Sequence, residues 1–278
     1  MQENDSPTPI IPRRRTHPGG VSAILELWRY RDLLRSLVIR DLKIKYQRPF
    51  LGLLWTLLNP LLTMGILITV FSYVVRIPIK NYWAFLISGF FVWNFAQQCL
   101  FHATTVLQNH ASLNRSVYFP REVLILGAAL SKLVEFLLET ALVILLLAVF
   151  YHHALPAALI LIPLLVAALL LIILGLMFPL AVAAVFFHDV QHAVPIAMMS
   201  LFYLSPVFYP LEMIPASFQP FYFLNPIAGL LTLFHVVLYQ GGWPSLAQTA
   251  STVAMALATG WIGYLIFNRY KDVCVEIA

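Results

Sequence analysis

The sequence RDLKIKYQRPFLGLLWTLLNP, residues 40–60, joins a cationic segment to a long apolar one. The first nine of these residues hold four basic side chains, Arg40, Lys43, Lys45 and Arg48. From Phe50 onward the chain is apolar as far as Val75. Lys and Arg are stable beside anionic headgroups and unstable in hydrocarbon. The stretch therefore predicts a cationic surface segment that leads directly into a first membrane span.

The composition indicates a membrane protein. Of the 278 residues, 61% are hydrophobic and 10% charged, and the mean hydropathy is +0.84. A water-soluble domain of this size could not bury so much apolar surface, so we expect an all-α polytopic membrane protein. The basic residues behind the net charge of +5 lie beside apolar runs, which favours lipid headgroups over nucleic acid as the acidic partner. Cys99 and Cys274 give no disulfide framework, and no CxxC or HExxH motif predicts a metal site.

Four segments follow from the sequence pattern. Residues 1–23 are Pro-rich and basic, and we expect a disordered cytoplasmic tail. Residues 24–47 have an apolar face at the helical period, which predicts an amphipathic helix in the cytoplasmic interface; a soluble surface helix is the alternative. Residues 48–270 form the transmembrane domain, and residues 271–278 a second cytoplasmic tail.

We expect six spans, at residues 51–75, 82–107, 123–150, 156–187, 193–209 and 246–267. The fourth is longer than one untilted crossing of about 20 residues, so it should bend at Pro163 and Pro179. With the N-terminus inside, fourteen Lys and Arg residues lie on the inner side, and only Arg76 and Lys80 lie outside. This asymmetry predicts that both termini are cytoplasmic.

Between the fifth and sixth predicted spans, the apolar run 227–239 is too short to cross a membrane. Two short helices that meet at Asn225 and Pro226, dip into the outer leaflet and return would keep six crossings. Backbone at such a turn must face protein or a wet cavity, so the segment is a candidate gate. Its predicted residues are Asn225, Pro226, Leu230, Leu233 and Phe234. A helix lying flat on the outer surface is the alternative.

Charged side chains inside the third span are the next candidates. Lys132, Glu135 and Glu139 share one helical face, and charges at that depth usually face a cavity or a partner. One interpretation is a structural pair between Lys132 and Glu135 near the cytoplasmic entrance. The other is a polar face that binds a phosphate-bearing lipid headgroup.

Aromatic residues gather where the topology places the outer leaflet. An interfacial belt explains many of them, but flat aromatic rings also pack against the C–H faces of sugars, as the lining of a polysaccharide channel would. The candidate channel residues are Phe71, Tyr73, Trp83, Phe202, Tyr203, Phe208 and Tyr209.

Three motifs in chain order resemble one transporter family. Residues 40–60 resemble the start of the type 2 ABC permeases that export polysaccharides and polyol phosphates. Residues 114–126, NRSVYFPREVLIL, resemble the cytoplasmic coupling segment of that family. Residues 205–238, SPVFYPLEMIPASFQPFYFLNPIAGLLTLFHVVL, resemble its periplasmic gate region.

The resemblance implies a homodimer of six-helix subunits in the bacterial cytoplasmic (inner) membrane, with a channel between them. Two copies of a separate ATPase would dock below and hold ATP and Mg, whereas this chain has no GxxxxGK[ST] motif and no cofactor of its own. The cargo would be an undecaprenyl-linked glycan such as O-antigen, with capsule and teichoic acid as alternatives. The implied ATPase-coupling residues are Arg40, Lys43, Asn114, Arg115, Phe119, Pro120, Arg121, His188 and Asp189. At His188 the family often has an arginine.

Two other classes fit less well. An ion-coupled secondary transporter would use Lys132, Glu135 and Glu139 as a relay, but its internal repeats are not visible. A membrane-embedded glycosyl- or lipid-modifying enzyme would need clustered acidic and histidine residues on the outer loops, where Glu212 is the single carboxylate in this topology.

Overall fold

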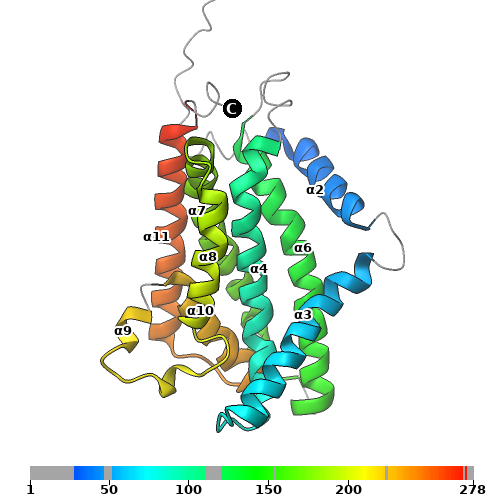
Figure 1. Cartoon of the computed structure of the whole chain (residues 1–278), viewed down its shortest axis with the longest axis vertical. Coiled ribbons are helices and arrows are strands. Elements are labelled where there is room, and N and C mark those ends of the chain that lie inside the picture. The colour runs from blue at the N-terminus through cyan, green and yellow to red at the C-terminus, as the bar shows by residue number, and fades with distance from the viewer. Residues whose placement is uncertain are drawn as a thin grey trace, which may run out of the picture.

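The computed structural model describes residues 28–46, 52–109, 120–152, 155–222, 225–271 and 273. Within these ranges all regular secondary structure is helical. The long helices stand side by side as an upright bundle, with α4 in the middle and α11 and α6 on opposite sides of it (Figure 1). The shorter α2 lies outside α6 at the end of the bundle where α11 ends (Figure 1).

Four helices are long and apolar enough to cross a membrane. They are α4 (Tyr82–Asn109), α6 (Glu122–Leu147) with its extension η2 (Ala148–His152), α7 (Ile162–Phe186) preceded by η3 (Ala157–Leu161), and α11 (Leu246–Tyr270). They correspond to the second, third, fourth and sixth predicted spans. A run of about 20 apolar residues is long enough to cross the membrane, so the hydropathy of the sequence alone locates these helices.

The first predicted span is also a continuous helix, α3 (Gly52–Thr69) followed by the π-helical turn η1 (Val70–Val74). It crosses the bundle obliquely from α2 towards the far end (Figure 1). The hydroxyls of Thr63 and Thr69 donate to carbonyls one turn earlier, so neither polar group is left unpaired on this apolar helix.

The helix of the fifth predicted span ends at Tyr203, before the predicted end of the span at Tyr209. Helix α8 (Val190–Tyr203) has 14 residues and is followed by turns, because Ser205 and Pro206 begin a tight reversal in which Val207 N–H donates to the Ser205 carbonyl. At about 1.5 Å per residue α8 is roughly 21 Å long, which is less than the ~30 Å hydrocarbon core. The count of six crossings therefore stays a prediction.

The bend expected at Pro163 stays a prediction. Pro163 lies in the first turn of α7, where a missing N–H leaves no helical hydrogen bond unmade. Pro163 therefore lies where the 3-10 helix η3 passes into the α-helix. Pro179 does lie inside α7.

Glycines let α7 and α11 pack with their backbones in contact. A Cβ on Gly263 would fall on the Gly175 carbonyl, and a Cβ on Gly175 would fall on the Thr259 carbonyl. Gly260 faces the Leu171 side chain, whose Cδ1 lies 2.6 Å from where a Cβ would stand. Small residues of this kind are typical of close helix contacts in membranes. We call this contact the glycine seam.

Helix α10 (Pro226–Phe234) lies inside the bundle against α4, α7 and α11, and its extension η5 (His235–Tyr239) lies against α4, α6 and η3. Asn225 caps α10 by accepting from the Ile227 N–H at 3.0 Å, and Pro226 occupies the first turn. Leu230 and Leu233 are fully buried, which contradicts a helix lying flat on the surface. The preceding α9 (Gln219–Tyr222) is a single turn.

Helix α2 (Arg31–Tyr46) packs on α6, as its amphipathic pattern requires. Leu37 is buried, and Leu34 and Leu37 lie over Gly127 of α6, where a Cβ would stand 3.3 Å from the Leu37 Cβ. The basic side chains Arg35 and Lys43 of α2 are exposed.

Candidate functional site

The two ends of the bundle differ in chemistry. At the end that includes the last turn of α11, Gln108 donates to the Ala184 carbonyl and accepts from Gln191, and Lys271 lies 2.7 Å from a carboxylate oxygen of Glu122. We call this the basic end. At the opposite, aromatic end, the Tyr82 hydroxyl donates to the Phe208 carbonyl and the Tyr239 hydroxyl to the Lys80 carbonyl.

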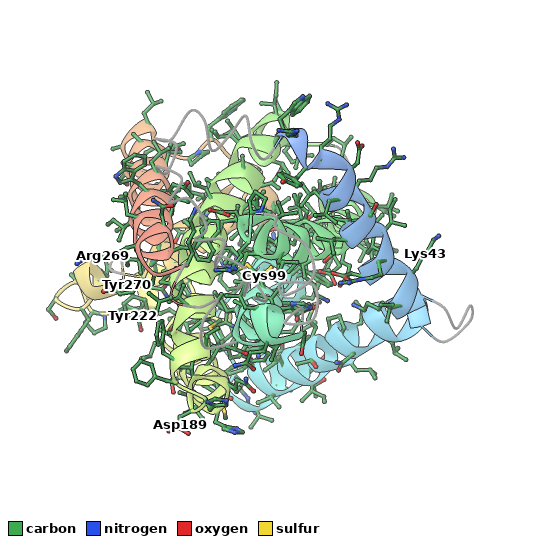
Figure 2. The ribbon with its side chains drawn as sticks, turned by 90° about the horizontal axis from the view of Figure 1, so that it is seen from above. Lys43, Cys99, Asp189, Tyr222, Arg269 and Tyr270 are labelled. Carbon is green, nitrogen blue, oxygen red and sulfur yellow. The ribbon has the colours of Figure 1, made fainter. Side chains whose placement is uncertain are left out.

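Of the predicted ATPase-coupling residues, six are described, and four of them lie on or next to the basic end. Pro120 and Arg121 precede α6, and His188 and Asp189 form the exposed turn between α7 and α8. Asp189 lies at the rim of the bundle seen from above, and Lys43 of α2 points away from the ribbon on another side (Figure 2). The predicted residues Asn114, Arg115 and Phe119 lie outside the described ranges.

Arg121 and Arg40 are both engaged within the chain. The Arg121 guanidinium donates to the Lys271 carbonyl at the C-terminal end of α11. Because helix C-termini carry unpaired carbonyls and partial negative charge, this contact stabilises the end of α11. Arg40 binds its neighbour Asp41 at 2.9 Å. Arg121 therefore joins α6 to α11 whatever else it contacts.

Lys45 of α2 joins the predicted charged face of α6. One carboxylate oxygen of Glu135, Oε2, lies 2.7 Å from Lys45 Nζ and 3.5 Å from Lys132 Nζ. The Glu135 side chain is 6% exposed, whereas those of Lys45 and Lys132 are 32% and 18% exposed. The shorter bond is therefore the one between helices, and Glu135 ties α2 to α6.

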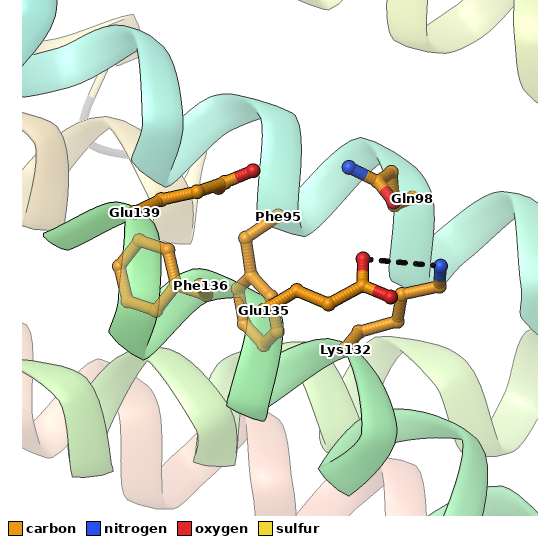
Figure 3. Close-up of a pocket in the computed structure, with 6 residues that line it drawn as sticks. All are labelled: Phe95, Gln98, Lys132, Glu135, Phe136 and Glu139. Carbon is orange, nitrogen blue, oxygen red and sulfur yellow. Dashed lines mark hydrogen bonds and ion pairs between the residues drawn. The ribbon is translucent and has the colours of Figure 1, made fainter. Parts of the chain in front are cut away.

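Glu139 lies one turn further along α6 and is almost fully buried. Its Oε1 atom has no hydrogen-bond partner in the part of the chain that the structure describes. Glu135, Glu139 and Lys132 line one small recess with Phe95 and Gln98 of α4, and the recess has no room for a water molecule (Figure 3). We call these four charged residues, Lys45, Lys132, Glu135 and Glu139, the charged cluster.

Six of the seven predicted channel aromatics belong to one network of neighbouring rings, which runs from Phe71 through Tyr82 and Phe85 to Tyr239. Phe71 stacks on Phe208 at 4.8 Å between ring centres, and Phe208 also contacts Phe202, Tyr203 and Tyr209. Most of these rings are at least partly buried, so within one copy of the chain they pack against one another.

Trp83 joins this network at its other end, where it meets Tyr151 edge-on at 6.2 Å and Tyr151 stacks on Tyr239 at 5.5 Å. Tyr73 is 75% exposed, which distinguishes it from the rings of the network.

The predicted gate residues occupy the interior of the subunit. Leu230, Leu233 and Phe234 are buried among α4, α7 and α11. Asn225 has a second function besides capping α10, because its side-chain amide donates to the buried Ser205 hydroxyl at 2.9 Å. A gating role for these residues stays a prediction.

Sequence reasoning missed Lys45 and Gln108. Lys45 was assigned to a general cationic segment, although its position at the end of α2 and the carboxylates of α6 were a signal for an ion pair. Gln108 gave no such signal. One of its partners is the backbone carbonyl of Ala184 and the other is the uncharged Gln191, and neither can be recognised as a partner from the sequence. Within the described residues no three His, Cys, Asp or Glu side chains are grouped so that they could hold a metal ion.

A family model described as "ABC-2 type transporter" matches residues 32–239. The chain belongs to this family. Membership of the ABC-2 transporters makes it a membrane-embedded permease and implies a separate ABC ATPase as its partner. The matched segment begins in α2 and ends in η5. It therefore includes the charged cluster, α10 and the part of the basic end that precedes α11 in the chain.

The ABC-2 permease is similar over most of its length to three curated proteins, each named "O-antigen export system permease protein RfbA". One, from Myxococcus xanthus, is 30% identical over 258 residues, which is 92% of this chain and 99% of that protein. Two from Klebsiella pneumoniae are 28% and 27% identical over 250 and 246 residues, each 88% of this chain and 95% of the relative.

Proposed function

We propose that the chain is the membrane subunit of an ATP-driven exporter that moves an undecaprenyl-linked O-antigen across the bacterial cytoplasmic membrane. The observation that carries this proposal is the similarity to three O-antigen export permeases along nearly the whole of both chains. The length of the match matters because the outer and inner ends and the helices between them are all included. A shared membrane span alone would support no particular cargo.

The orientation follows from charge. The basic end faces the cytoplasm and the aromatic end the periplasm, because fourteen Lys and Arg residues lie on the inner side of the expected topology and two on the outer side. This places His188, Asp189 and Arg121 where an ATPase would dock. Six crossings result if α8 completes its crossing together with the turns that follow it.

Two copies of the chain form the transporter, with the glycan path between them. Apolar side chains stay exposed around one copy, on α3, α6, α8 and α11; examples are Leu62, Ile66, Leu138, Ile196 and Trp261. Such a surface needs lipid or a second subunit to cover it. The exposed ring of Tyr73 at the aromatic end is then available to a sugar, as are the partly exposed rings beside it.

The charged cluster is the site for the lipid diphosphate. Lys45 and Lys132 share a single oxygen of Glu135, so a phosphate could take either ammonium group without leaving Glu135 unpaired. Phosphate oxygens bind Lys as a point charge and need no fixed geometry. Because Lys45 belongs to α2, headgroup binding there would loosen α2 from α6 beside the docking end.

Deletion of the chain from its native strain tests the proposal. O-antigen should disappear from the cell surface, and lipid-linked O-antigen should accumulate inside the cell. The full chain supplied in trans should restore surface display, provided that the partner ATPase is intact. An ATPase variant that cannot hydrolyse ATP should block display in the same way and serves as the control.

Persistent O-antigen display in the deletion strain would contradict the proposal. Loss of capsule or teichoic acid with O-antigen unchanged would assign the chain to one of those glycans instead.

A further inference from the structure

A second polar pocket opens at the aromatic end, away from the charged cluster. It has a volume of about 290 Å³ and lies between η4 (Leu211–Met213), η5 and the start of α11. Its lining includes one carboxylate, two side-chain amides and one indole, from Glu212, Gln240, Gln248 and Trp243. None of these four residues belongs to the predicted channel, gate or coupling sets.

Three of the polar side chains that line this pocket are unused within the described part of the subunit. The side chains of Glu212, Gln240 and Gln248 hydrogen-bond to none of the described residues, and Trp243 is 62% exposed. Some glutamines elsewhere are engaged: Gln108 binds Ala184 and Gln191, and Gln219 donates to the Ile214 carbonyl. Free donors and acceptors that converge on one cavity are what a polar ligand requires.

The floor of the pocket is rigid. The ring of His235 stacks on Phe85 at 4.1 Å, with Nδ1 2.7 Å from the Ser88 hydroxyl and Nε2 donating to the Pro206 carbonyl. Gly89 makes room for this ring, since a Cβ there would stand 2.6 Å from His235 Cε1. Both ring nitrogens are therefore occupied, and the histidine shapes the pocket without binding the ligand.

The walls are also fixed before a ligand binds. Pro206, Pro210 and Pro244 line the pocket, and the fixed φ angle of proline limits how far these loops can rearrange. Ser245 caps α11 by accepting from the Gln248 N–H at 3.2 Å, which positions the Gln248 side chain on the first turn. A pre-formed site loses little conformational entropy on binding.

We propose that this pocket binds an uncharged sugar residue of the glycan as it emerges on the outer side; the inference rests on the proposed export function. Its volume is near the lower end of the ~300–1,000 Å³ of ordinary ligand sites, which suits a sugar ring and not a lipid. Amides both donate to and accept from sugar hydroxyls, and a carboxylate accepts from them. The Trp243 ring offers a flat face to the C–H side of the sugar.

Charge sets the selectivity. Glu212 is the charged residue in the lining, so a carboxylate or phosphate on the sugar would meet a like charge. An acidic sugar is therefore excluded, and a neutral hexose or N-acetylated hexosamine is accepted. The site acts on the glycan and differs in this from the charged cluster, which would take the diphosphate.

Saturation-transfer NMR on the full permease with its ATPase tests the pocket. The complex is placed in lipid nanodiscs, because detergents with sugar headgroups would compete. The probes are methyl mannoside, methyl galactoside, methyl N-acetylglucosaminide and methyl glucuronide. The wild-type complex should give signals with at least one neutral glycoside and none with the glucuronide.

Two pairs of variants test how Trp243 and Glu212 contribute to glycoside binding. Trp243→Leu should weaken neutral glycoside binding roughly fivefold, the size of one lost aromatic contact, whereas Trp261→Leu should leave it unchanged. Trp261 is a matched control because it is also 62% exposed but lies on α11 outside the pocket. Glu212→Gln should admit the glucuronide, and Asp189→Asn at the opposite end should not.

The proposal is overturned if the wild-type complex binds no neutral glycoside, if both tryptophan variants bind alike, or if Glu212→Gln leaves the glucuronide excluded. Each of these results leaves the export proposal standing when the wild-type chain still restores O-antigen display. Failure of display with pocket binding intact would overturn the export proposal alone.

Discussion

The glycine seam and the charged cluster are two helix contacts of opposite kinds in one bundle. At the seam α7 and α11 meet through backbone atoms at Gly175 and Gly263, with no side chain between them. At the cluster α2 meets α6 through the long side chain of Lys45, whose ammonium group is 2.7 Å from Glu135. The first contact depends on shape, and the second adds an ion pair to the apolar packing of Leu37 on Gly127.

This difference separates a fixed contact from a reversible one. Backbones in van der Waals contact tolerate no rearrangement, because any shift creates either an overlap or a void. An ion pair whose lysine is 32% exposed can exchange its partner for another anion at small cost. We therefore expect α7 and α11 to move as one body during transport, and α2 to move relative to α6.

The largest effect should come from breaking the seam. Gly263→Ala places a methyl group on the Gly175 carbonyl, and backbone cannot move aside as a side chain can. We expect a loss of about 3 kcal/mol of stability and little protein in the membrane. Thermal unfolding of the variant in nanodiscs measures this loss of stability.

A graded series controls for the effect of the substitution itself. Gly260→Ala should cost less because it meets the flexible Leu171 side chain, and Gly65→Ala should cost nothing because no atom lies within 4 Å. Equal stability of the three variants would refute the seam.

A smaller effect is expected at the cluster. Glu135→Gln leaves Lys45 and Lys132 without their shared counter-charge, and we expect about 2 kcal/mol less stability in the attachment of α2. Amide hydrogen exchange in α2 should quicken about 30-fold while exchange in α11 stays unchanged. Asp41→Asn is the matched control, because Asp41 pairs with Arg40 on the same helix. Faster exchange in α11 as well would show that the two contacts are not independent.

The sequence predicted the helices better than the contacts between them. Hydropathy placed α4, α6, α7 and α11 because each of them is long and apolar enough to cross a membrane on its own, and it also placed α3. It misplaced the end of α8 because residues 193–209 stay apolar through a turn that Ser205 and Pro206 determine, and hydropathy does not register turns.

The charged cluster, too, could be predicted only in part, because a sequence shows local patterns and not the contacts between distant segments. The shared face of Lys132, Glu135 and Glu139 follows from helical spacing, so it could be predicted within one segment. The pair of Lys45 with Glu135 spans 90 residues, and the seam joins Gly175 to Gly263. Such contacts depend on how helices are placed next to one another, which no local pattern encodes.

The smallest effects on stability are expected when the two lysines of the charged cluster are replaced one at a time. Lys45→Met should cost about 1 kcal/mol and Lys132→Met less, because 2.7 Å is a close ion pair and 3.5 Å a weak one. If the cluster binds the diphosphate, however, Lys132→Met should reduce O-antigen export strongly despite its small effect on stability. Export that falls only in proportion to stability would make both lysines purely structural.

Transport by purified components tests the central claim most directly. The chain and its partner ATPase are reconstituted in liposomes that carry lipid-linked O-antigen on the outer, ATPase-accessible leaflet. The account predicts that added ATP moves the glycan into the lumen, where an external glycosidase cannot reach it, and that an ion gradient without ATP does not. Movement driven by an ion gradient alone, or ATP hydrolysis with the glycan left outside, would contradict it.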